Sequence, residues 1–155
     1  MITTERQYRI TKAEARRFEE ALFRAAGTES PRIDPRIQQA MREGMESQLQ
    51  ELHEEIGEYE ALRSGQVTVL ELDSLKELPE ALIRARIASR LTQKELAARL
   101  GLKEQQIQRY EATRYAGVSL DRIDEIATAL GLIIKERVVL PSAAGEDQLG
   151  QPGSP

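Results

Sequence analysis

The sequence contains no cysteine and no tryptophan, and aromatic residues make up only 4% of its 155 residues. The absence of cysteine excludes disulfides, cysteine-ligated zinc, cysteine nucleophiles and iron–sulfur clusters, and it fits a reducing cytoplasm. No apolar run approaches the roughly 20 residues that span a bilayer, and the polar N-terminus lacks the apolar segment of a secretory signal. We therefore expect a cytoplasmic protein that does not enter a membrane and whose core consists of Leu, Ile, Val and Ala.

Residues suited to catalysis are also scarce. His53 is the single histidine, which excludes Cys–His and multi-histidine sites, and neither a G-x-S-x-G nor a P-loop pattern occurs. The carboxylates around His53 are interpreted as the solvated face of a long helix rather than a catalytic dyad. We expect no enzyme activity, no metal site and no cofactor.

The net charge is −4, but it is unevenly distributed. Residues 1–65 carry 10 Lys and Arg against 13 Asp and Glu, a net charge of −3, whereas residues 66–140 carry 12 against 11, a net charge of +1. The distribution matters more than the total for a protein that binds nucleic acid. Any DNA affinity must depend on where individual Arg and Lys residues lie, and on dimerisation.

Residues 1–65 are expected to form an N-terminal helical region. Thr11 and Glu14 form a capping box that predicts a helix over residues 11–25, which Gly27 ends, while residues 2–9 are interpreted as a short strand or an arm. Asp34-Pro35 predicts the start of a second helix of about 30 residues that ends before Ser64-Gly65. This helix has a heptad-like apolar stripe: Ile37, Met41, Met45, Leu49, Leu52, Ile56 and Tyr59. A stripe of this length must pair with the 11–25 helix, with a second subunit, or with both.

Two short runs rich in β-branched residues predict strands, at 67–72 and at 132–140. The first belongs to a strand and linker at 66–74, and the second to a C-terminal strand at 133–141. Residues 142–155 are rich in Gly and Pro and are expected to be a disordered tail.

A helix–turn–helix pattern lies between the two predicted strands. Thr92 and Glu95 form a capping box for a short helix, Gly101 ends it, and a second helix begins near Lys103 with Ile107 facing inward. Ser119 caps a last helix, which Gly131 ends. A short capped helix, a glycine turn and a second helix with a polar face can present that second helix to a major groove.

This part of the chain resembles the lambda-repressor-like, or Xre, family of DNA-binding domains over roughly Leu78–Leu132. The resemblance rests on Leu91-Thr92-Gln93, Glu95-Leu96-Ala97, Gly101, Ile107 and the closing helix from Ser119-Leu120 to Gly131, with Arg86 upstream and Glu111 downstream. It differs from the family in a longer loop, Thr113–Val118, and in Lys103, where Ser or Thr often caps the second helix. The resemblance implies a mainly α fold: a five-helix domain over residues 75–132 that binds operator DNA, preceded by the helical hairpin and flanked by the two strands.

The resemblance also implies roles for individual residues. Four residues on the second helix would contact base edges, because Gln can bind adenine and Arg can bind guanine bidentately: Glu104, Gln105, Gln108 and Arg109. Five residues would contact phosphates, which set register rather than sequence: Gln93, Lys94, Lys103, Arg114 and Tyr115. Tyr115 could equally pack over the loop. Arg86 and Glu111 would form a structural ion pair rather than touch DNA.

Taken whole, the chain resembles the HigA-like antitoxins of type II toxin–antitoxin systems, which bind their own operator as dimers and neutralise an RNA-cleaving toxin. The resemblance implies a homodimeric repressor, with residues 10–65 as the surface for dimerisation or for a basic ribonuclease. Two alternatives stay open: a phage-type or housekeeping repressor without a toxin, and a protein-interaction module whose helix–turn–helix has lost DNA binding. The sequence does not distinguish which element would make the dimer.

Overall fold

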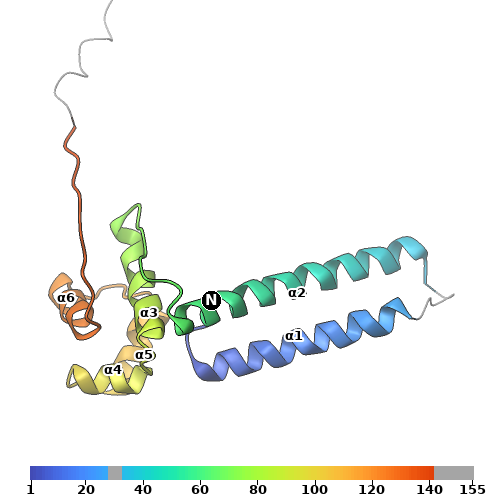
Figure 1. Cartoon of the computed structure of the whole chain (residues 1–155), viewed down its shortest axis with the longest axis horizontal. Helices are drawn as coiled ribbons and strands as arrows, with labels where there is room; N and C mark the ends of the chain where they lie inside the picture. The colour runs from blue at the N-terminus through green and yellow to red at the C-terminus, as the bar shows by residue number, and fades with distance from the viewer. Residues whose placement is uncertain (28–32, 142–155) are drawn as a thin grey trace, which may run out of the picture.

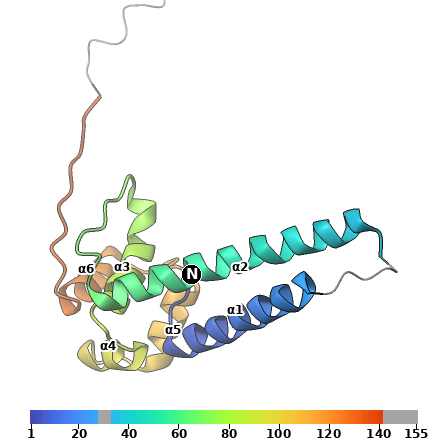
Figure 2. The ribbon, with the colours of Figure 1, turned by 45° about the vertical axis from the view of Figure 1, so that its right-hand side comes forward.

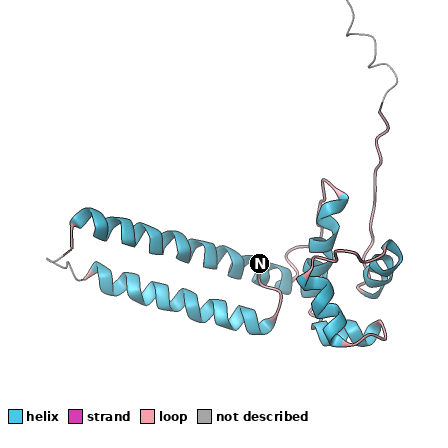
Figure 3. Ribbon diagram, turned by 180° about the vertical axis from the view of Figure 1, so that it is seen from behind, coloured by secondary structure: helices cyan, strands magenta, loops and turns pink. Residues whose placement is uncertain are grey.

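The computed structural model describes residues 1–27 and 33–141. These residues form six α-helices and one turn of 3-10 helix (Figure 3), so the mainly helical fold is confirmed. The elements are α1 (Glu5–Ala26), α2 (Pro35–Ser64), η1 (Leu75–Glu77), α3 (Leu78–Ala88), α4 (Gln93–Arg99), α5 (Glu104–Ala112) and α6 (Leu120–Ala129).

Helix α1 begins six residues before the predicted position. The Thr4 hydroxyl accepts a hydrogen bond from the Gln7 backbone N–H, and the Gln7 side chain accepts one from the Thr4 N–H, which completes a capping box. The sequence predicts the box at Thr11 and Glu14, but Gln7 serves as well as Glu at the third helical position, because its amide oxygen accepts the same backbone hydrogen bond. The predicted strand or arm at residues 2–9 is therefore wrong, because α1 already includes residues 5–9.

Helix α2 starts and stops as predicted. The Asp34 carboxylate accepts a hydrogen bond from the Arg36 N–H at 2.8 Å, and Pro35 occupies the first helical position. Gly65 ends the helix at φ +80°, a left-handed conformation that glycine adopts without steric cost.

Helices α1 and α2 pair as an antiparallel hairpin (Figure 1), one of the pairings predicted for the apolar stripe. The pairing buries the half of the stripe nearest the rest of the protein, where Leu52, Ile56 and Tyr59 pack beneath Ala15. The Tyr8 ring stacks on Tyr59 with their centroids 4.9 Å apart. Towards the far end of the hairpin the stripe stays exposed, and Ile37 and Met41 are each more than half exposed.

Helices α3 to α6 form a small bundle around a second part of the core. Five side chains are almost completely buried there: Leu82, Ile83, Leu96, Ile107 and Ile126. The bundle has four α-helices and the turn η1, whereas five helices were predicted over residues 75–132.

The base of the hairpin packs directly on the bundle, so that both parts share one hydrophobic core. Ile2 is 3% exposed, and Leu62 at the end of α2 is equally buried. The Arg84 guanidinium of α3 pairs with the Glu58 carboxylate of α2 at 2.7 Å. Figure 2 shows the hairpin projecting from the bundle, with the start of α1 close to α5.

The two predicted strands are wrong for the described chain. Residues 67–72 and 132–140 are extended or irregular, and neither run forms a ladder with a described segment. Val69, Val138, Val139 and Leu140 are each more than 70% exposed. A β-branched composition favours a strand only where a second strand and a surface to cover are available. The predicted disordered tail at 142–155 lies outside the described residues.

Candidate DNA-binding site

The local sequence dictates the angle between α4 and α5. Thr92 and Glu95 form the predicted capping box at the start of α4, and the backbone hydrogen bond to Thr92 lowers the pKa of Glu95. Gly101 follows α4 at φ +65°, and the Leu102 N–H then donates to the Ala97 carbonyl at 2.8 Å. Ala97 is 1% exposed, so the small side chain allows the two helices to approach closely.

Helix α5 presents the predicted polar face to solvent. Glu104, Gln105, Gln108 and Arg109 are exposed and are called the recognition face below, whereas Ile107 on the opposite side is fully buried. The Gln108 amide donates to the Glu104 carboxylate at 3.2 Å. The Arg109 guanidinium lies 6.0 Å from the centre of the Tyr110 ring. The face thus offers amide, carboxylate and guanidinium groups, the set that can pair with base edges.

A buried ion pair joins α3 to α5, between the two residues that sequence analysis paired. The Arg86 Nε and Nη2 atoms both donate to the Glu111 carboxylate, the second at 2.8 Å, and both side chains are only 3% exposed. Arg86 also donates from Nη1 to the Leu91 carbonyl and from Nη2 to the Thr3 carbonyl, each at 2.9 Å. Four polar groups therefore meet at a largely buried site, where each charge has more than one hydrogen-bond partner.

Gln93 belongs to the same network. Its amide nitrogen donates to the Glu111 carboxylate at 2.7 Å, which ties the first residue of α4 to the end of α5. The phosphate contact predicted for Gln93 stays a prediction, for which the second N–H of the amide nitrogen and the backbone N–H are the candidate donors. The contact with the Thr3 carbonyl was not foreseen, since no local pattern connects positions 83 residues apart.

The remaining phosphate candidates separate into two groups. Lys94 and Lys103 are exposed on either side of the helix–turn–helix, as a phosphate contact requires. Arg114 is also exposed, but its guanidinium pairs with the Glu80 carboxylate at 2.7 Å.

Tyr115 does not fit the predicted phosphate contact. Its side chain is 3% exposed, and its hydroxyl makes no hydrogen bond with a described residue. Burial raises the pKa of the Tyr115 hydroxyl. The alternative interpretation, packing beneath the loop, describes this residue, because a hydroxyl without solvent access cannot reach a phosphate.

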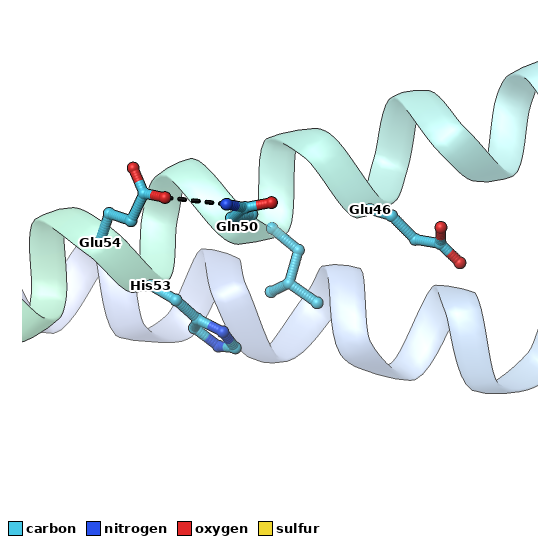
Figure 4. Close-up of a pocket in the computed structure, with 5 residues that line it drawn as sticks. Glu46, Gln50, His53 and Glu54 are labelled. Carbon is cyan, nitrogen blue, oxygen red and sulfur yellow. Dashed lines mark hydrogen bonds between the residues drawn. The ribbon is translucent and has the colours of Figure 1, made fainter.

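His53 lies away from the helix–turn–helix, in a shallow hollow on α2 (Figure 4). Glu46, Gln50 and Glu54 line the same hollow, and the Gln50 amide donates to the Glu54 carboxylate at 2.9 Å. The His53 Nε2 atom lies 3.0 Å from the Glu19 carboxylate of α1. The hollow is open and acidic, and within the described residues no three potential ligands cluster for a metal ion.

Residues 82–133 match a protein-family model described as helix-turn-helix. The match spans α3 to α6 and covers about one third of the chain. No curated protein and no solved structure matches the chain. No described helix is long and apolar enough to cross a membrane. The matched residues include the whole recognition face, and a helix–turn–helix of this kind indicates sequence-specific DNA binding.

Proposed function

We propose that this protein is a transcriptional regulator of the lambda-repressor-like type, which places α5 in the major groove of operator DNA. The observation that carries the proposal is the division of α5 into a buried side and a solvent side. Ile107 and Glu111 hold the helix on the bundle, and all four residues of the recognition face are exposed, so they are accessible to base edges. The role is recognition rather than catalysis, in the cytoplasm.

Contacts to phosphates would set the register of α5 on the duplex. Lys94 lies exposed in the first turn of α4, where its ammonium group is the candidate phosphate contact. Lys103, just before α5, would reach the opposite side of the groove. These contacts carry no sequence information, which rests with the recognition face.

The regulator is proposed to act as a homodimer. A bundle of this size covers few base pairs, and two copies on half-sites about one DNA turn apart would double the contacts. The exposed apolar residues of α2, Ile37 and Met41, and those of the extended segment near Val138 are surfaces on which a second copy can pack. Light scattering at tens of micromolar tests this assignment, and a monomeric mass would contradict it.

A HigA-like antitoxin is the more specific form of the proposal. Helix α2 carries seven Glu and three Arg, a net charge of −4, and its hollow at Glu46 and Glu54 suits a cationic side chain. A basic ribonuclease would be drawn to such a helix, because complementary charge speeds encounter. A repressor without a toxin is the alternative within the same class, and a toxin gene beside the coding sequence would distinguish the two.

A gel shift on the DNA upstream of the coding sequence, with competitor DNA present, tests the proposal. Arg109→Ala should lower affinity for the specific site by roughly 5- to 150-fold, since one bidentate base contact contributes about 1–3 kcal/mol. Arg36→Ala is the matched control, because it removes the same charge at the far end of α2. Equal loss in both variants, or no shift at moderate salt, would instead favour a protein-interaction module.

A further inference from the structure

The two helices of the hairpin carry opposite charge. Helix α1 has six Lys and Arg against four Glu, a net charge of +2, whereas α2 has a net charge of −4. The net charge of −3 for residues 1–65 is therefore the sum of contributions from a basic helix and an acidic one. A partner of one charge would attract one of these helices and repel the other.

The charge on α1 is concentrated on its outer side. At 100° per residue, Arg6, Arg9, Arg16 and Arg17 fall within a sector of about 100°, opposite Ala15, which packs on α2. We call these four residues the arginine face. All four are exposed, and none forms a hydrogen bond or ion pair with a residue that the structure describes.

The neighbouring charges do not neutralise this face. Lys12 lies outside the sector, where Tyr8 and Glu60 hold its ammonium group and raise its pKa. Glu20 is the one carboxylate within the sector. Four guanidinium groups against this one carboxylate leave the sector with a net positive charge, which suits an anionic partner.

The arginine face begins beside the DNA-binding unit. Thr3, three residues before Arg6, accepts a hydrogen bond from Arg86, and Arg86 holds Glu111 of α5. Figure 2 shows the start of α1 next to α5, from which α1 leads away along the hairpin. From Arg6 to Arg17 the face extends for about 16 Å at 1.5 Å per residue, which is about half a turn of DNA.

We propose that the arginine face binds the phosphodiester backbone of the duplex beside the site that α5 contacts. The proposal rests on the proposed function, and it extends the DNA interface beyond the matched helix–turn–helix. Guanidinium groups bind phosphate oxygens bidentately, and the duplex offers one charge for about every 1.7 Å of its axis. The acidic helix α2 lies on the side of α1 opposite the arginine face. It would therefore point away from the phosphates and remain accessible to another partner.

The test measures affinity against salt for the full chain on its selected operator. Two paired variants, Arg6→Gln/Arg9→Gln and Arg16→Gln/Arg17→Gln, are combined into a fourfold variant, and Arg36→Gln/Arg42→Gln on α2 is the charge-matched control. Each lost phosphate contact should reduce the slope of log K against log salt by about 0.9. Loss of two to four contacts corresponds to roughly 30- to 1,000-fold weaker binding at 0.15 M salt, if affinities converge at 1 M.

Sequence preference should be unchanged in these variants, because phosphate contacts do not distinguish bases. Hydroxyl-radical footprints should lose protection of backbone positions beside the α5 site and keep the protection at that site. Glutamine retains helix propensity, so the thermal midpoint should stay constant.

If the fourfold variant binds its operator specifically and keeps the wild-type slope of log K against log salt, the arginine face does not contact phosphates. The proposed function would then still stand. An equal fall in slope for the Arg36 and Arg42 control would also overturn the proposed role of the arginine face, because the effect would then come from net charge. Failure of the wild-type protein to select any sequence would overturn the proposed function as well, and an acidic protein would then be the partner to seek.

Discussion

Replacing Glu111 by alanine removes the one carboxylate that faces the Arg86 guanidinium. The structure leaves Arg86 only the carbonyls of Leu91 and Thr3 as partners, at 2.9 Å each, and its side chain is 3% exposed. A buried charge that loses its counter-ion costs about 3–5 kcal/mol, because water cannot replace the lost interaction. Gln93 loses its acceptor in the same variant. We therefore expect Glu111→Ala to lie at the upper end of that range.

The measurement is urea unfolding at 25 °C, followed by circular dichroism, with the thermal midpoint as a second readout. For a chain of this length, 1 kcal/mol shifts the midpoint by about 2–4 °C, so the variant should melt roughly 6–20 °C lower. Glu80→Ala is the control, because Glu80 pairs with Arg84 and Arg114 at the surface, where ion pairs contribute about 0–1 kcal/mol.

A double-mutant cycle separates the ion pair from the other bonds of Arg86. Arg86→Met with Glu111→Ala removes both charges, and it should be more stable than Glu111→Ala alone, although the Leu91 and Thr3 carbonyls lose a donor; Arg86→Met alone completes the cycle. A free energy of unfolding for Glu111→Ala within 1 kcal/mol of the wild type would refute the reasoning, since it would mean that water or another group reaches Arg86.

Three further outcomes are expected. Gln105→Ala should abolish sequence preference in DNA binding without altering the unfolding curve, because this side chain is exposed in the free protein; unfolding of the variant would contradict the orientation of α5. Tyr115→Phe should stabilise the fold by about 1 kcal/mol, because it removes a buried hydroxyl that has no described partner. Because the pKa of Tyr115 is raised in the folded protein, the unfolded chain loses this proton first as pH rises above 10, and the wild type becomes less stable. Tyr115→Phe has no hydroxyl to titrate, so its thermal midpoint should fall less with pH in this range. Gly44 lies inside α2 with open space at its Cβ position, so Gly44→Ala should stabilise the protein by about 0.5–1 kcal/mol. Gly65→Ala should destabilise it by about 1–2 kcal/mol, because alanine is strained at φ +80°. Calorimetry in which the Gly65 variant melts above the Gly44 variant would contradict both expectations.

The helix ends were the most predictable part of the fold where a side chain caps the backbone locally. Asp34-Pro35, Thr92 with Glu95, and Gly101 each act on atoms within a few residues, so their effect can be derived without the rest of the molecule. The start of α1 differs from the prediction because Thr4-Gln7 and Thr11-Glu14 both have the spacing of a capping box, and only the first caps the helix.

The two strand predictions were wrong because a strand, unlike a helix cap, depends on distant residues. The β-branched runs at 67–72 and 132–140 have the composition of strands, but pairing depends on a second segment, and the described chain supplies none. The arginine face was missed because the predicted helix began at residue 11, which left Arg6 and Arg9 outside it. Extending the helix to Glu5 would have revealed the spacing from the sequence alone.

By itself, the sequence determined the helix–turn–helix, the side of α5 that turns to solvent and the pairing of Arg86 with Glu111. The first two follow from short-range periodicity and capping, which act within a few turns of helix. The third follows from the resemblance to a known family, because Arg86 and Glu111 lie 25 residues apart. Only the tertiary structure decided that the hairpin docks on the bundle through the Thr3 carbonyl and that Tyr115 lies in the core. Those features depend on contacts between distant segments, where burial and hydrogen-bond geometry, rather than local preference, determine the outcome.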